Sequence, residues 1–292
     1  MNINQKKIIK MIAILALVCV GVGILSRVLK QNSLTLEDYA NANPEIAYQK
    51  KETETEEAIA EDEADTDGSQ SQIQSSLTGA LLNSAVDVNE RTEYTDGFYY
   101  EPLSDNLRRY ITGVSFPEDT DDTVISYDDL TYVHIWHYDF NGEPAEGELI
   151  CNKAIAQDLV EIFYELYRNE YQIEKVRLID EYDGDDTASM EDNNTSCFNY
   201  RVVEGSSSLS KHAYGLAIDI NPYYNPYITY ENDGTQTVAP VSAEVYADRS
   251  LSFPYKIDDT DLCYKLFTQH GFIWGGDWNS VKDYQHFQKA ID

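Results

Sequence analysis

Basic side chains are scarce in this sequence. Its 292 residues hold 21 lysines and arginines against 52 aspartates and glutamates, which gives a formal net charge of -31 at pH 7. A protein of this charge repels polyanions, which argues against nucleic acid as the main partner. The chain nevertheless has the composition of a folded protein, with 42% hydrophobic residues and 23 tyrosines.

Cysteine is also rare, with four in the chain and no CxxC pair among them. The missing CxxC pair argues against a structural zinc finger. Cys19 lies in an apolar run near the N-terminus, and Cys151, Cys197 and Cys263 come much later. Three thiols cannot all pair within one chain, so at most one disulfide is possible among them, and the sequence does not choose it.

One long apolar run is present, Met11–Leu25, and three lysines precede it. Basic residues before an apolar segment favour a cytoplasmic N-terminus and export of the rest of the chain. The side chain of Arg27 can snorkel, which extends the span. We therefore expect a cytoplasmic tail at 1–10, a transmembrane signal anchor at 11–29 and an extracytoplasmic remainder, as a single-pass protein of the cell membrane. Secretion after cleavage of a signal peptide is the alternative.

Residues 30–95 have the composition of an acidic, disordered linker. Glu52–Asp67 contains nine acidic residues in sixteen, and such a segment repels itself and buries too little apolar surface to fold. A spacer of this kind holds a domain away from a membrane. The folded domain is expected at 96–292.

Short strands and helices alternate in that domain. Aromatic and branched residues, helical spacing and turn residues predict strands at Thr131–Phe140, Glu148–Cys151 and Ile173–Ile179, an amphipathic helix at Lys153–Tyr167, a loop at Asp183–Asn194, and a helix capped by Asp258–Thr260 that ends near His270. This pattern predicts an α+β fold, a single compact domain with a small, mostly antiparallel sheet flanked by helices.

A carboxylate interrupts an apolar run in "SLSKHAYGLAIDINP", Ser208–Pro222. Because side chains alternate along a strand, Ile218 faces the core and Asp219 faces the opposite side. Gly215 lets the chain bend between His212 and this strand. An imidazole and a carboxylate that converge on one point favour a metal ion, with zinc first.

A third ligand is available in "DYQH", which ends at His286. Three protein ligands leave one position open, as catalytic zinc requires. Asp283, three residues earlier, is placed to accept a proton from water and deliver it to a leaving amine. Arg201, in an aromatic segment before His212, is a candidate to stabilise an oxyanion or to hold a substrate carboxylate.

These motifs resemble those of the M15 peptidases, which include D-alanyl-D-alanine carboxypeptidases and L-alanyl-D-glutamate endopeptidases. "SLSKHAYGLAIDI" resembles their SxHxxGxAxD pattern, "GGDW" followed by "KDYQHF" resembles their closing element, and "YR" resembles their arginine. The resemblance spans about residues 125–290. It implies His212, Asp219 and His286 as zinc ligands, Asp283 as catalytic base and Arg201 as a substrate or transition-state contact. It also implies peptidoglycan stem peptides as substrate.

Further residues are weighed as walls of a substrate pocket, and two other hypotheses stay open. The pocket candidates are Ser210, Tyr214, Trp274 and Trp278. Ser210 can equally cap a turn, and the aromatic side chains can simply pack. His134, His137 and His270 are expected to be structural.

The activity expected is that of a D-alanyl-D-alanine carboxypeptidase. Cleavage of the L-Ala-D-Glu bond is one alternative, and a zinc-containing, wall-binding module without turnover is another. The oligomeric state is left open.

Overall fold

The computed structural model describes residues 77–119, 123–203, 206–230 and 233–291. Apart from Arg249–Phe253, which group with a separate unit, these residues belong to one compact unit. Across the described ranges, no helix combines the length and the apolarity needed to cross a membrane. The tail at 1–10 and the anchor at 11–29 lie outside those ranges and stay predictions.

The largest sheet is antiparallel and has the order β1-β2-β3-β4. Its strands are β1 (Thr92–Thr95), β2 (Phe98–Glu101), β3 (Leu130–Tyr138) and β4 (Pro144–Asn152). The two strands expected around Thr131 and Glu148 are therefore present. β4 begins earlier than expected, because Pro144 at the end of the presumed turn still pairs with Tyr138.

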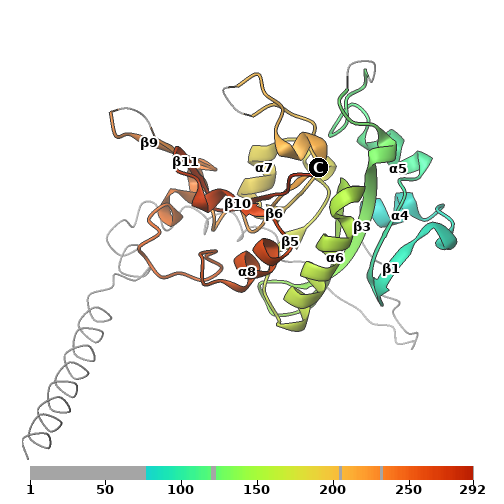
Figure 1. Cartoon of the computed structure of the whole chain (residues 1–292), viewed down its shortest axis with the longest axis horizontal. Helices are drawn as coiled ribbons and strands as arrows, with labels where there is room; N and C mark the ends of the chain where they lie inside the picture. Colours follow the sequence, from blue (N-terminus) through green and yellow to red (C-terminus); the bar gives the residue numbers. More distant parts are fainter. Residues whose placement is uncertain (1–76, 120–122, 204–205, 231–232, 292) are drawn as a thin grey trace, which may run out of the picture. The chain divides into compact units, whose positions relative to one another are not determined.

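The amphipathic helix α6 (Lys153–Arg168) lies across the sheet that contains β3 (Figure 1). Its N-cap is Asn152, whose side chain accepts a hydrogen bond from the backbone N–H of Ala154. The buried residues recur at helical spacing, as the sequence predicts: Ile155, Ala156, Leu159, Val160, Ile162, Phe163 and Leu166.

Within the described residues, three small sheets accompany the largest one, so the fold is α+β but its strands are spread over four sheets. One antiparallel sheet has the order β10-β12-β7, with β10 at Ile273–Trp274, β12 at His286–Gln288 and β7 at Ala217–Asp219. Another has the order β11-β8-β9, with β11 at Val281–Asp283, β8 at Tyr227–Tyr230 and β9 at Gln236–Ala239. The last is parallel and joins β5 (Lys175–Val176) to β6 (Asn194–Thr195).

Three of the expected segments differ from those in the structure. The polar loop around Asp183–Asn194 contains helix α7 (Asp186–Glu191), which is too short to show apolar periodicity and is capped by the side chain of Asp185. The strand expected at Ile173–Ile179 is reduced to β5 and passes into the 3₁₀ helix η3 (Ile179–Tyr182). Helix α8 (Leu262–Gln269) starts after Asp261, whose side chain caps it, and is followed by His270 and by Gly271 at φ +82°.

The folded part begins earlier than residue 96. Helix α4 (Thr78–Asn83), the 3₁₀ helix η1 (Val88–Glu90) and β1 lie within the range expected for the linker. The buried carboxylate of Glu148 accepts hydrogen bonds from the backbone N–H groups of Gly79 and Ala80. Leu77 is also buried in the core, and Ala80 and Leu82 pack against other buried side chains. Sequence periodicity misses this segment because α4 has only six residues and β1 only four.

Two clusters of buried side chains form the core. The smaller cluster lies under helix α5 (Asp105–Ile111) and the 3₁₀ helix η2 (Tyr127–Asp129). The larger one joins α6 and the main sheet to the small sheet of β7 and β12, through residues such as Phe163, Ile218 and Phe287. The short strands that carry the candidate site therefore share the main core.

Candidate metal centre

Strand pairing brings the two motifs together. β7 and β12 are antiparallel, and Asp219 lies directly opposite His286. The next pair, Ile218 and Phe287, is fully buried in the core. Because side chains alternate along each strand, Asp219 and His286 lie together on the opposite face.

A short helical turn adds His212 to this pair. The 3₁₀ helix η4 (Lys211–Tyr214) is capped by Ser210, whose hydroxyl accepts the backbone N–H of His212 at 3.2 Å. Gly215 ends the turn at φ +64°, and a Cβ atom there would lie 2.6 Å from the backbone nitrogen of Asn152. Only glycine allows this turn to lie so close to the end of β4.

The three side chains form one compact group. Asp219 Oδ2 lies 3.2 Å from His212 Nε2, and Asp219 Oδ1 lies 3.0 Å from His286 Nδ1. The nitrogens His212 Nε2 and His286 Nδ1 are 3.2 Å apart. One ligand atom from each residue lies within 4.8 Å of the others, which is the spacing of a group that could hold a metal ion.

Hydrogen bonds at the far sides of the imidazoles fix which nitrogens face the centre. His212 Nδ1 lies 2.5 Å from the carbonyl oxygen of Cys197, and His286 Nε2 lies 3.1 Å from Oε1 of Gln288. Both acceptors favour a proton on the nitrogen that faces them. In their neutral forms, which metal ligation requires, both imidazoles would therefore keep the proton on the outer nitrogen and present the lone pairs of His212 Nε2 and His286 Nδ1 to the centre.

Asp283 supplies a second carboxylate at the edge of the group. It ends β11, and its Oδ2 lies 3.9 Å from His286 Nδ1. Its other oxygen, Oδ1, is buried and has no hydrogen-bond partner among the described residues. A buried carboxylate oxygen that is ionised and has no hydrogen-bond partner destabilises the folded state. A cation or a proton next to Asp283 Oδ1 would therefore be stabilising.

The charges of the group are strongly coupled. Burial opposes ionisation of Asp219, but the charge of His212 and hydrogen bonds from both histidines hold the pKa of this carboxyl well below its usual range. Burial likewise lowers the pKa of His286, but the adjacent Asp219 outweighs it and raises the pKa to about 9. Burial, assisted by the charge of Asp219, raises the pKa of Asp283 to about 7.

These residues fit a divalent metal ion. Two imidazole nitrogens and a carboxylate oxygen are the donor set of zinc, and both imidazoles carry the outer hydrogen bonds that such ligands usually have. The same negative charge that stabilises a proton on His286 would stabilise a cation between the three side chains. The fit agrees with the ligands that the sequence predicts, His212, Asp219 and His286.

Arg201 is bound to another carboxylate. Its guanidinium forms an ion pair with Asp186 at the start of α7, and Asn199 also donates to that carboxylate, at 2.9 Å. The backbone carbonyl of Arg201 accepts the N–H of Ser210, which caps the turn of His212. The arginine thus lies on the segment that supports the centre, and its role toward a substrate stays a prediction.

The four pocket candidates have different surroundings. Trp278 lies beside the centre, with its ring centroid 5.4 Å from that of His286. Trp274 is buried, and its indole N–H donates to the carbonyl of Tyr284 at 2.9 Å, so it packs within the core. Ser210 is buried under the turn, and the ring of Tyr214 lies 5.6 Å from the ammonium group of Lys211.

The remaining histidines and the described cysteines lie outside the group. His134 and His137 are buried in β3 and bond backbone carbonyls through Nδ1, whereas His270 follows α8 and pairs with Asp158. The free thiols of the described cysteines, Cys151, Cys197 and Cys263, are buried without a disulfide between them. Burial raises the pKa of each thiol.

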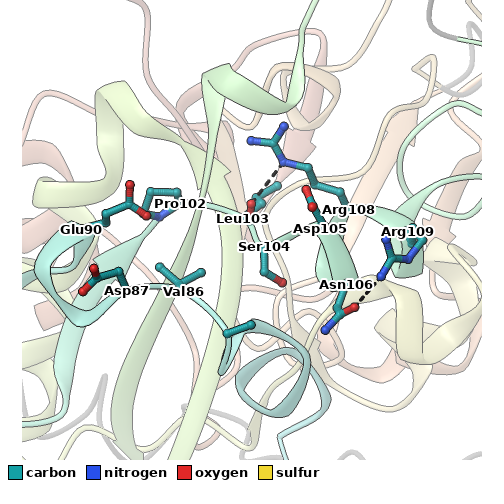
Figure 2. A pocket seen from close by; sticks show the side chains of 11 residues that line it. Val86, Asp87, Glu90, Pro102, Leu103, Ser104, Asp105, Asn106, Arg108 and Arg109 are labelled. Atoms are coloured by element: carbon teal, nitrogen blue, oxygen red, sulfur yellow. Dashed lines mark hydrogen bonds between the residues drawn. The ribbon is translucent and has the colours of Figure 1, made fainter.

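A separate hollow of about 630 Å³ lies in the N-terminal part of the unit (Figure 2). The carboxylates of Asp87 and Glu90 lie on one side of it, and the guanidinium groups of Arg108 and Arg109 on the other. None of its lining residues belongs to the histidine and aspartate group. The hollow is therefore not part of the candidate metal centre.

Two supporting side chains were not anticipated from the sequence. Gln288 is two residues from His286, so strand alternation alone places both on one face and could have identified it. Asp186 had no such signal, because it lies in a polar segment that resembles a loop. The carbonyl of Cys197 is a backbone group, and no side-chain pattern marks it.

The comparisons with known proteins agree with this geometry. No curated protein and no solved structure matches the chain. Among protein families, a match covers residues 204–289, the segment that contains His212, Asp219, Asp283 and His286. That match indicates a peptidase and is to the M15 family model described as D-alanyl-D-alanine carboxypeptidase, which confirms the resemblance to M15 peptidases over these residues.

Proposed function

We propose that this protein is a zinc-dependent peptidase that hydrolyses peptide bonds in peptidoglycan stem peptides, with D-alanyl-D-alanine carboxypeptidase activity. One observation carries the proposal: three buried ligand atoms from His212, Asp219 and His286 converge, with the carboxylate of Asp283 beside them. The family match over residues 204–289 supports the same reaction class.

The metal ligands, Asp283 and Arg201 have separate roles in the proposed hydrolysis. When bound by His212, Asp219 and His286, zinc supplies Lewis acidity toward a carbonyl oxygen and lowers the pKa of water. Asp283 takes a proton from the attacking water and delivers it to the leaving amine. Burial favours the protonated form of Asp283, whereas a cation bound beside it would favour the ionised form, so the same carboxyl can accept and release the proton. Arg201 stabilises the developing oxyanion or holds the substrate carboxylate.

The proposed setting is the outer side of the cell membrane. The expected anchor at 11–29 holds the chain in the membrane, and the acidic segment before the folded unit acts as a spacer toward the wall. The strong negative charge of the chain favours solubility of the exported part.

Digestion of purified muropeptides tests the proposal. The full chain, loaded with zinc, is incubated with stem peptides that end in D-Ala-D-Ala, and the products are weighed by mass spectrometry. The expected product has lost one alanine. Asp283→Asn should reduce the rate by about 10²- to 10⁴-fold, whereas Asp259→Asn, at an exposed position outside both motifs, should leave it unchanged.

A second candidate is endopeptidase cleavage of the L-Ala-D-Glu bond. The observation that favours it is the ion pair of Arg201 with Asp186. This pair already engages the guanidinium that would otherwise bind the terminal carboxylate of a carboxypeptidase substrate. The same digestion separates the two activities, because a split stem differs in mass from a stem that has lost one alanine. Binding to wall peptides without any product would instead support a non-catalytic module.

A further inference from the structure

Each imidazole of the centre has one hydrogen-bond acceptor behind it, but the two acceptors differ in kind. His212 Nδ1 bonds the backbone carbonyl of Cys197, whereas His286 Nε2 bonds the side chain of Gln288 at 3.1 Å. A backbone acceptor is set by the fold alone. The orientation of His286 therefore depends on a side chain that can be replaced.

The strand geometry holds Gln288 in place. β12 is the central strand of its sheet, paired with β7 on one side and with β10 on the other. His286 and Gln288 lie on the same face of it, with the fully buried Phe287 between them on the opposite face. Gln288 lies opposite Ala217 in the register, and the single methyl group there leaves room for the glutamine to reach back toward the imidazole.

We infer that Gln288 is the positioning residue of the metal centre, since its amide oxygen selects the Nε2–H tautomer of His286 and directs Nδ1 toward the metal. This inference rests on the proposed zinc site. A neutral imidazole can carry its proton on either nitrogen, and only the tautomer with Nε2–H offers Nδ1 as a ligand. Hydrogen-bonded partners of this kind typically affect metal affinity by 10- to 100-fold.

Zinc affinity gives the direct test. The dissociation constant is measured for the full chain by competition with a chromophoric zinc chelator, which requires no turnover. Gln288→Leu, which removes the acceptor, should weaken zinc binding by about 10- to 100-fold. Gln288→Glu keeps an acceptor oxygen and should bind zinc within a few-fold of the parent. Gln236→Leu makes the same change at an exposed strand position and should have no effect.

A second measurement uses the parent protein and so does not depend on whether a variant folds. In zinc-loaded parent protein with ¹⁵N-labelled histidine, the spectrum should show His286 protonated at Nε2 and coordinated through Nδ1. Coordination through Nε2, or parent-like zinc affinity in a folded Gln288→Leu variant, would overturn the inference.

The outcomes also separate this inference from the proposed function. If the parent binds zinc and Gln288→Leu weakens it, but no muropeptide is cleaved, the positioning role stands and the peptidase fails. If muropeptides are cleaved and Gln288→Leu binds zinc like the parent, only the positioning role fails.

Discussion

Gly275 lies directly against Asp283. A Cβ atom at Gly275 would be 2.6 Å from the carbonyl oxygen of Asp283 and 2.7 Å from its Cβ atom. Real Cβ atoms do not approach backbone so closely, so any larger residue at this position has to displace Asp283. The absence of a side chain at Gly275 thus sets the position of the proposed catalytic base.

We expect Gly275→Ala to reduce muropeptide hydrolysis by about 10- to 100-fold, because a displacement of about 1 Å can have that effect on a positioned group. Zinc affinity should change little, since Asp283 is not among the three ligands. Steady-state rates and chelator competition measure the two effects separately. Gly113→Ala is the control: it lies in open space at φ +81°, so it should lower stability through backbone strain and leave the rate unchanged.

Zinc should stabilise the fold as well as support activity. At a free concentration 100 times its dissociation constant, a ligand that binds only the native state adds about 2.7 kcal/mol. A chelator should therefore lower the thermal midpoint and abolish hydrolysis, and zinc should restore both. His286→Ala should lose the zinc-dependent shift, whereas His270→Ala, at the end of α8, should retain it. Equal shifts in both variants would contradict the assigned site.

Arg201→Ala should separate a substrate role from a structural role. Both partners of the Arg201–Asp186 pair are partly exposed, with side-chain exposures of 33% and 28%, so loss of the pair should cost at most about 1 kcal/mol of stability. If the guanidinium stabilises the transition state, kcat/KM should fall by about 10²- to 10³-fold. Arg168→Ala, which removes another paired arginine at the end of α6, should leave kcat/KM unchanged.

Asp180 should make stability depend on pH. Burial raises its pKa from 3.8 to about 6, despite hydrogen bonds from Ser115 that lower it. The native state therefore binds this proton more tightly than the unfolded state. The stabilisation that Asp180 adds to the free energy of unfolding is complete below pH 4 and is lost as pH rises through 6. At about 1.4 kcal/mol per pKa unit, the full change is roughly 3 kcal/mol.

Urea denaturation of parent and Asp180→Asn at pH 4.5 and pH 7 measures this effect. The variant should remove the part of the decline that comes from Asp180, so its stability relative to the parent should increase toward pH 7. Asp259→Asn, at an exposed site, should follow the parent at both values. A relative stability of Asp180→Asn that is constant with pH would contradict the assignment.

The sequence predicts those parts of the structure that depend on local patterns. The buried face of α6 follows from helical spacing, and the opposite orientations of Ile218 and Asp219 follow from strand alternation. Helix α7 and the segment from α4 to β1 were not predicted, because their helices and strand are too short to show a periodic pattern. The pairing of Asp219 with His286 joins residues far apart in the chain; ligand chemistry and the family motifs indicated that the two residues meet, but no local pattern gave the strand register.

The register between β7 and β12 also limits which changes of chain length the protein tolerates. A strand that slips by one residue turns every side chain to the other face, so a single insertion close before His286 would direct its imidazole into the space now filled by Phe287. Extra residues in the hairpin between β8 and β9 would have no such effect on the β7–β12 pairing. Variation in loop length among related chains should therefore be concentrated away from the short link between β11 and His286.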